Sequence, residues 1–150
     1  MTTESIDRDV RLLVYEHFLA EALPPTSEEI ATALSLPPDE VDASFRRLEE
    51  GHALVFVPGT RTIWMANPLS AFPTPFRVET SRGAYWGACI WDAFGIVAML
   101  GDGGVVLTSC ADCGEKMMLR VEDGALAPTE GGVAHFAVQA RRWWDNIAYT

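Results

Sequence analysis

Apolar residues recur at three- and four-residue spacing over positions 5–21, and this period predicts an amphipathic helix. The run Leu23-Pro24-Pro25 should end it, because a residue before proline disfavours the α conformation. Thr26 and Glu29 have the spacing of a capping box, so we expect a second helix to begin there. The apolar faces of these helices consist of Ile6, Val10, Leu13, Val14, Phe18, Ile30, Ala33 and Leu34.

A third helix and a hairpin should follow. Pro38 suits the first turn of a helix and Gly51 suits its C-terminal cap, with an apolar stripe between them. Two short apolar runs within residues 53–66, separated by a Pro-Gly-Thr turn, predict a β-hairpin. Three helices and a hairpin have the order of a winged helix-turn-helix, so we predict a winged-helix-like subdomain over residues 1–66.

The remaining residues, 67–150, are predicted to form a second unit, which makes the fold α+β. A proline-rich connector opens this unit. The apolar run at 84–100 predicts a long helix, or a helix after a short loop. The apolar side chains of the connector, expected to be buried, are Leu69, Phe72 and Phe76.

Alternating apolar residues between turn signals predict a small mixed sheet in this second unit. The end of the chain is aromatic and should pack on that sheet. The predicted strands cover residues 76–80, 105–109, 117–122 and 133–139. The packing residues at the end are Trp143, Trp144, Ile147 and Tyr149.

The composition predicts a packed globule, because 49% of the 150 residues are apolar and 21% are charged. The longest apolar stretch is interrupted by Asp92 and is too short to span a bilayer, so we expect no membrane association. The polar N-terminus lacks a secretory signal. Three cysteines in such a chain predict reduced thiols and a cytoplasmic location.

The net charge of −10 argues against nucleic acid as a partner, because phosphate binding depends on Lys and Arg displacing counterions. In a DNA-binding winged helix, the predicted third helix would be the recognition helix. It carries five acids against two bases, and the hairpin adds a single base, Arg61. We therefore favour the alternative in which the helical part packs against the second unit.

Cys89 and Asp92 stand three residues apart in the sequence YWGACIWDAFGI. On a helix, this spacing places a thiol and a carboxylate on one face, about a turn apart. The surrounding aromatic residues should desolvate the carboxylate and raise its pKa, so that it can hold and donate a proton. An activated thiol beside it is a ligand for soft metals. From spacing alone we favour the structural alternative, in which Cys89 is a small buried residue and Asp92 a hydrogen-bonded helix residue.

Five sequence blocks together resemble the alkylmercury (organomercurial) lyase family over nearly all of residues 67–150. The C-x-x-D pair of Cys89 and Asp92 is the most specific feature, and Cys110 in its strand–turn context supports it. The resemblance implies an α+β fold, with a helical winged-type subdomain followed by a sheet and a cysteine-bearing helix. The blocks are NPLSAFPTPFRV, YWGACIWDAFGI, TSCADCGEKMMLRV, HFAV and ARRWWDNIAYT.

The resemblance implies protonolysis of a carbon–mercury bond. Two thiolates, one of them Cys89, would ligate mercury, and Asp92 would take a thiol proton and deliver it to the leaving carbanion. Hg(II) would then stay on the thiolates until external thiols remove it. The implied partners are an organomercurial or other soft-metal ligand and thiol acceptors, with no dissociable organic cofactor. By the match of the closing block, the family's second catalytic cysteine would fall just past Thr150.

Cys110 and Cys113 form a C-x-x-C-G motif, which is similar to half of a zinc knuckle. A structural zinc site needs four ligands, and the chain holds no second pair, although Cys89 could add a third thiolate. These two cysteines are weaker metal-ligand candidates than Cys89. A redox pair and a turn with two incidental thiols are the alternatives.

Three functions fit these observations. The first is an organomercurial lyase. The second is a thiol-based mercury- or metal-binding protein, or a regulator of that kind, without lyase activity. The third is a structural relative whose partner is another protein, with an apolar surface near the C-terminus that serves oligomerisation.

Overall fold

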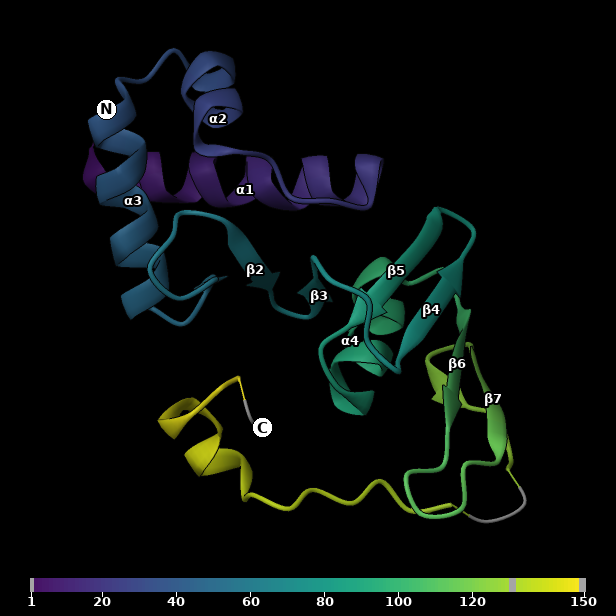
Figure 1. Ribbon diagram of the computed structural model, residues 1–150. Coiled ribbons are helices and arrows are strands. Elements are labelled where there is room, and N and C mark those ends of the chain that lie inside the picture. Colours follow the sequence, from purple (N-terminus) through teal and green to yellow (C-terminus); the bar gives the residue numbers. More distant parts are fainter. Residues whose placement is uncertain (1, 130–131, 149–150) are drawn as a thin grey trace.

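The computed structural model describes residues 2–129 and 132–148 and begins with three helices (Figure 1). They are α1 (Thr3–Glu21), α2 (Ser27–Leu34) and α3 (Pro38–Glu50), as the sequence predicts. The Thr26 side chain accepts from the Glu29 N–H while the Glu29 carboxylate accepts from the Thr26 N–H, which completes the predicted capping box. None of the described helices is both long and apolar enough to cross a membrane.

The strands join into a single sheet with the order β1-β2-β3-β5-β4-β6-β7-β8, in which every described pair is antiparallel. The predicted α+β class is confirmed, but the sheet is larger than expected and is not mixed. The predicted hairpin (β1–β2) forms one end of it, and the division into residues 1–66 and 67–150 stays a prediction. The strands are β1 (Val55–Phe56), β2 (Ile63–Ala66), β3 (Leu69–Ser70), β4 (Arg77–Thr80), β5 (Gly83–Gly87), β6 (Gly104–Ser109), β7 (Lys116–Glu122) and β8 (Ala125–Leu126).

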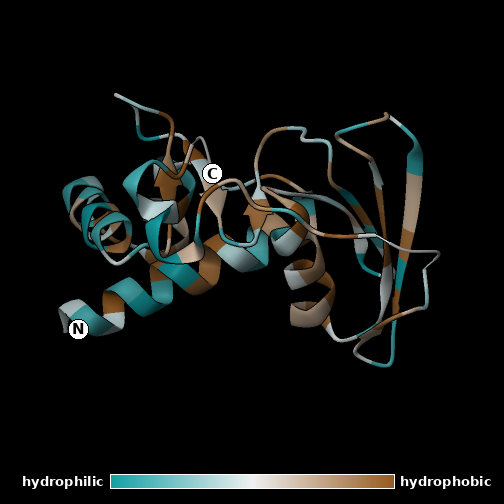
Figure 2. Ribbon diagram, turned by 90° about the horizontal axis from the view of Figure 1, so that it is seen from below, coloured by the Kyte–Doolittle hydropathy of each residue, from teal (hydrophilic) through white to brown (hydrophobic). Residues whose placement is uncertain are grey.

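The predicted long helix over residues 84–100 is wrong in its first part. Tyr85 and Trp86 belong to strand β5, and the helix α4 covers only Ile90–Leu100. β5 lies between β3 and β4 and pairs with both, so ladder hydrogen bonds on two sides override the helical appearance of the apolar run. α4 packs on this part of the sheet and is hydrophobic along most of its length (Figure 2).

The predicted strand at 133–139 is also wrong. These residues form no strand and are mostly exposed, with Val133 at 90% exposure, and the strand that pairs with the C-terminal end of β7 is β8. A short 3₁₀ helix, η1 (Ala140–Asp145), follows. Phe72 in the connector is 45% exposed rather than buried, whereas Leu69 is fully buried.

The closing aromatic residues behave differently from one another. Trp144 stacks on His52, which follows α3, with ring centroids 3.9 Å apart. It remains 38% exposed, so it is not a core residue. Trp143 is half-buried and its indole N–H donates to the Val138 carbonyl at 2.9 Å. Tyr149, which we expected to pack on the sheet, lies outside the described residues.

Two tyrosines connect α1 to the sheet. The Tyr85 hydroxyl donates to the Leu19 carbonyl at 2.8 Å, and the Tyr15 hydroxyl donates to the Asn67 carbonyl at 2.6 Å. The Leu19 carbonyl belongs to the last turn of α1, where carbonyls lack partners within the helix. Tyr85 therefore satisfies a helix terminus and fixes α1 against the strand that leads into α4.

Replacing Tyr85 with phenylalanine should lower the free energy of unfolding by about 1–3 kcal/mol, because it leaves a helix-terminal carbonyl without this partner in a buried place. Urea unfolding followed by circular dichroism measures the change. Phe72→Leu is the control, since that exposed ring lies outside the core and its loss should cost under about 0.5 kcal/mol. Equal stability of Tyr85→Phe and the unmodified protein would contradict the role of this bond.

Candidate active site

Cys89 lies at the N-cap of α4, directly before the helix rather than inside it as predicted. Its backbone is extended, with φ −142° and ψ −178°, and its sulfur accepts a hydrogen bond from the Asp92 N–H at 3.5 Å. Serine, threonine or aspartate usually fills such a position. The thiol therefore takes the place of a capping oxygen, and the first turn of the helix holds it in position.

The Cys89 thiol also contacts the side chain that the sequence pairs with it. Its sulfur lies 3.3 Å from Oδ2 of Asp92, and the S–H donates to the carboxylate. The predicted proximity of these two side chains is thus present, although it comes from an N-cap geometry rather than from two positions on one helical face. A proton donor and a proton acceptor meet here without an intervening group.

Burial governs the proton affinity of both groups. The pKa of Cys89 is raised to about 11, first by desolvation and then by the negative charge and hydrogen bond of the Asp92 carboxylate, while the Asp92 N–H partly offsets the rise. Desolvation also raises the pKa of Asp92, against the lowering effect of its hydrogen bonds from Cys89. At neutral pH the resting state is therefore a protonated Cys89 that donates to Asp92.

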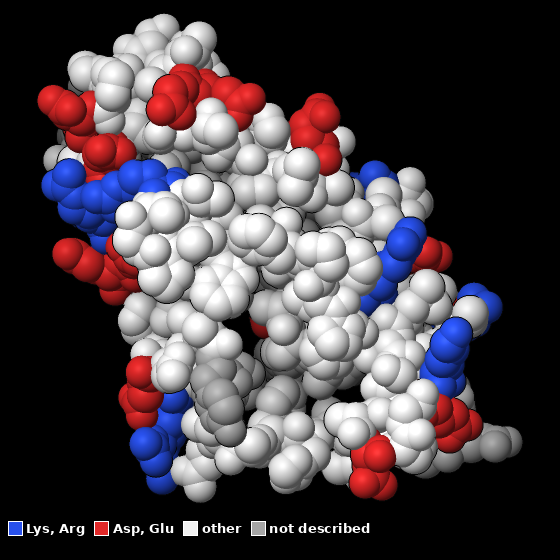
Figure 3. All heavy atoms as spheres, in the orientation of Figure 1, with Lys and Arg blue, Asp and Glu red and all other residues white. Residues whose placement is uncertain are grey.

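A pocket of about 190 Å³ opens over this pair. Charged side chains lie mostly around the margins of this face, and a small acidic patch is visible inside the hollow at its centre (Figure 3). Among the described residues that line the pocket, Asp92 is the one that carries a charge. The lining residues are Trp64, Met65, Asn67, Ser70, Thr74, Ala88, Cys89, Asp92, Trp143, Ile147 and Ala148.

Three separate segments build this pocket. β2 and the connector after it supply one wall, the start of α4 supplies the reactive pair, and the C-terminal segment supplies the opposite wall. Trp64 and Trp143, the aromatic residues of the described lining, were not predicted from the sequence to lie at the site. The aromatic neighbours that we expected there lie elsewhere, since Tyr85 is in the core and Trp91 is 64% exposed. No local sequence pattern identifies residues that reach the pocket only through tertiary contacts.

Gly87 allows α4 to start immediately after β5. A Cβ at this position would lie 2.6 Å from the backbone nitrogen of Ala93, closer than real side chains come. The Gly87 carbonyl accepts from the Thr74 hydroxyl at 2.6 Å, which ties the strand end to the connector. Pro68 lies on the other side of the helix, where a Cβ at Gly95 would meet its ring at 3.3 Å. The first turn of α4, and with it the Cys89–Asp92 pair, is held between strand and connector.

Cys110 and Cys113 lie outside the pocket, on the turn between β6 and β7. Hydrogen bonds to the Cys110 sulfur lower its pKa, first from the Cys113 N–H, then from the Asp112 N–H and from the Cys113 thiol. Within residues 2–129 and 132–148, no group of three or more His, Cys, Asp or Glu side chains could hold a metal ion. The three-thiolate arrangement considered from the sequence is therefore not present there.

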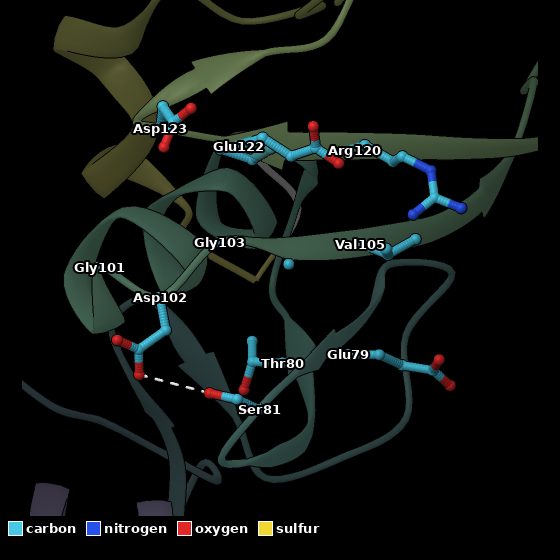
Figure 4. A pocket seen from close by; sticks show the side chains of 12 residues that line it. Glu79, Thr80, Ser81, Gly101, Asp102, Gly103, Val105, Arg120, Glu122 and Asp123 are labelled. Carbon is cyan, nitrogen blue, oxygen red and sulfur yellow. Dashed lines mark hydrogen bonds between the residues drawn. The ribbon is translucent and has the colours of Figure 1, made fainter.

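A larger hollow of about 680 Å³, open to solvent, lies beside the C-terminal end of β4 and the N-terminal end of β6. Acidic residues and one arginine line it, and Asp102 points towards Ser81, 3.4 Å away (Figure 4). Arg82 neutralises Asp102 through an ion pair of 3.0 Å. Among the described residues no thiol or histidine lines this hollow, so these side chains do not place a nucleophile beside a base.

Comparison with known proteins identifies related sequences and folds. The family model of alkylmercury lyase (MerB) matches residues 69–150. The crystal structure of the mercury-bound form of MerB2 has a similar fold, with a TM-score of 0.65 and 17% sequence identity. The alignment covers 84% of this chain and 60% of that one, so this chain spans about three-fifths of its length. A search of the curated proteins gave no match.

Replacing Asp92 with asparagine should lower the pKa of Cys89 below about 11, because the carboxylate's charge and its hydrogen bond both raise it. The thiolate fraction at pH 8–10 should rise, and with it the rate at which iodoacetamide modifies Cys89. Peptide mass spectrometry across this pH range measures the rate, with modification of the exposed Cys113 as the internal control. An unchanged or slower reaction of Cys89 would show that Asp92 does not set its proton affinity.

Replacing Gly87 with alanine should destabilise the protein by about 1–3 kcal/mol, because the added methyl group forces the backbone at Ala93 to move. Chemical denaturation measures the loss. Gly132→Ala is the matched control: its added Cβ would meet only the end of the Met117 side chain, at 3.8 Å. If both variants unfold at the same denaturant concentration, the close approach of β5 and α4 is not a constraint.

Proposed function

The chain belongs to the alkylmercury lyase family, and we propose that it cleaves the carbon–mercury bond of a small organomercurial by protonolysis. In this proposal Cys89 is the mercury ligand and Asp92 carries the proton. One observation supports it most directly: a protonated thiol donates to a half-buried carboxylate, 3.3 Å away, inside a small pocket whose described lining holds no other charged side chain. The ligand class also fits, because mercury is a soft metal and thiolate is the softest protein ligand.

The first step is mercury binding with loss of the thiol proton. The organomercurial cation R–Hg⁺ meets the sulfur of Cys89, the S–H bond breaks and an S–Hg bond forms. The proton moves to Oδ2 of Asp92, the atom that already accepts the S–H hydrogen bond. Burial supports this transfer, because it disfavours the carboxylate anion and so raises the proton affinity of Asp92.

The second step is proton delivery to carbon. The electron pair of the C–Hg bond takes the proton from Asp92, the hydrocarbon R–H leaves, and Hg(II) remains on Cys89. The carboxylate is then ionised again, as it was at the start. Placement of the acid beside the leaving carbon matters because a positioned proton donor contributes about 10²–10⁴-fold in rate.

The described lining of the pocket contains one thiol, Cys89. A further thiolate on mercury would raise the electron density at the metal and weaken its bond to carbon. Small thiols in solution can supply it, and they can also remove Hg(II) at the end. The pocket volume of about 190 Å³ suits a short alkyl group on mercury better than a bulky one.

Incubating the protein with methylmercury and an excess of small thiol should release methane and Hg(II), measured by gas chromatography and mercury speciation. Cys89→Ser should abolish turnover, because serine is a poor ligand for a soft metal. Asp92→Asn should reduce turnover by about a hundredfold or more, because the proton carrier is lost. Asp39→Asn, an exposed change on α3, should leave turnover unaltered.

Two outcomes would overturn the proposal. The first is absence of methane from the folded, unmodified protein at saturating thiol. The second is equal turnover by Asp92→Asn and the unmodified protein. Mercury retention that depends on Cys89 but produces no methane would instead support the alternative of a thiol-based metal-binding protein.

A further inference from the structure

The turn between β6 and β7 presents a pair of cysteines that the proposed reaction does not use. Residues 110–115 connect Ser109 to Lys116, the last ladder pair of the two strands. The turn is closed at its base by the Cys110 N–H, which donates to the Glu115 carbonyl at 2.8 Å. The Gly114 N–H donates to the Cys110 carbonyl at 2.9 Å, with Gly114 at φ 76°. The pair is thus carried by an ordered turn.

Both cysteines lie on the same side of this turn, because they are three residues apart and the Gly114 N–H to Cys110 carbonyl bond closes a single helical turn around them. The N–H groups of Cys113 and Asp112 and the Cys113 side chain lower the pKa of the Cys110 thiol. Neither cysteine forms a disulfide, Cys113 is exposed and Cys110 is half-exposed. Two reduced sulfurs therefore converge where an ion in solution can reach both.

The surroundings restrict the kind of ion. In the described part of the chain no third His, Cys, Asp or Glu completes a metal cluster with this pair. Structural zinc requires four protein ligands, so a closed zinc site is excluded among these residues. Hg(II) is a soft ion that forms stable complexes with only two thiolates, and the amide donors aimed at Cys110 stabilise a sulfur that carries negative charge.

We propose that Cys110 and Cys113 form a second thiol site, separate from the Cys89 pocket, that chelates Hg(II) as a two-coordinate bis-thiolate. Binding breaks two S–H bonds and forms two S–Hg bonds, and both protons pass to solvent. The choice of ion rests on the proposed function, since Hg(II) is the product of that reaction. The chelation itself requires neither Cys89 nor a carbon–mercury bond.

The test uses the full chain with Cys89→Ala, so that only Cys110 and Cys113 remain of its three cysteines. Hg(II) chloride is added with a millimolar excess of glutathione as competitor. Native mass spectrometry and the ultraviolet mercury–thiolate absorption then give stoichiometry and affinity. We expect one Hg(II) per chain. Adding Cys110→Ser or Cys113→Ser should each weaken binding about 10²–10⁴-fold, because the second sulfur no longer acts within the same molecule.

Three results would overturn the assignment. They are no mercury retention by Cys89→Ala, undiminished retention after either serine substitution, and Zn(II) binding as tight as that of Hg(II). Circular dichroism confirms that each variant is folded, which the exposed position of the turn favours. No organomercurial is used, and Cys89 is absent, so failure here leaves methane release untouched. Conversely, absence of methane release by the unmodified protein would not change this result.

Discussion

The close approach of the backbone at the junction of β5 and α4 is the constraint on which the candidate site depends. The strand ends and the helix begins within two residues, and the side-chain-free Gly87 lies against the backbone of Ala93. This geometry puts residue 89 at the N-cap, where its side chain must face the first turn. A cysteine at that place is directed at Asp92 by the same hydrogen bonding that starts the helix. The hydrogen bond that caps the helix therefore also positions the Cys89 thiol beside the Asp92 carboxylate.

Burial has opposite effects on the two halves of the proposed reaction. It makes the free thiolate of Cys89 unfavourable, so the unliganded site rests in its protonated form. A metal cation that enters the pocket compensates the negative charge that burial would otherwise penalise. Desolvation also makes Asp92 a better acceptor for the displaced proton. The uncharged walls around the pair therefore favour proton transfer only when the cation arrives.

The sequence predicted features whose causes are local. The helix starts at Pro38 and after Thr26 follow from capping and proline chemistry within one turn, and the Cys89–Asp92 contact follows from a three-residue spacing. The predictions from sequence failed where contacts between residues far apart in the chain determine the structure. Trp86 is in a strand because β3 and β4 pair on both sides of it, and residues 133–139 form no strand although their alternation predicted one. Trp64 and Trp143 line the pocket from segments about eighty residues apart, and no local sequence pattern predicts that they lie close together.

The C-terminal segment supplies one wall of the pocket. It is packed less tightly against the protein than the other parts of the site. No residue of η1 is buried, and exposed residues without regular structure precede it, whereas the base of α4 rests on fully buried side chains. The free energy needed to lift this segment is therefore set by surface contacts such as the Trp144–His52 stack and not by the core. Solvent can gain access to the reactive pair through a local opening, with the sheet and α4 intact. Amide hydrogen exchange in η1 would accordingly be decoupled from global unfolding, because this segment can separate from the pocket without disrupting the hydrophobic core.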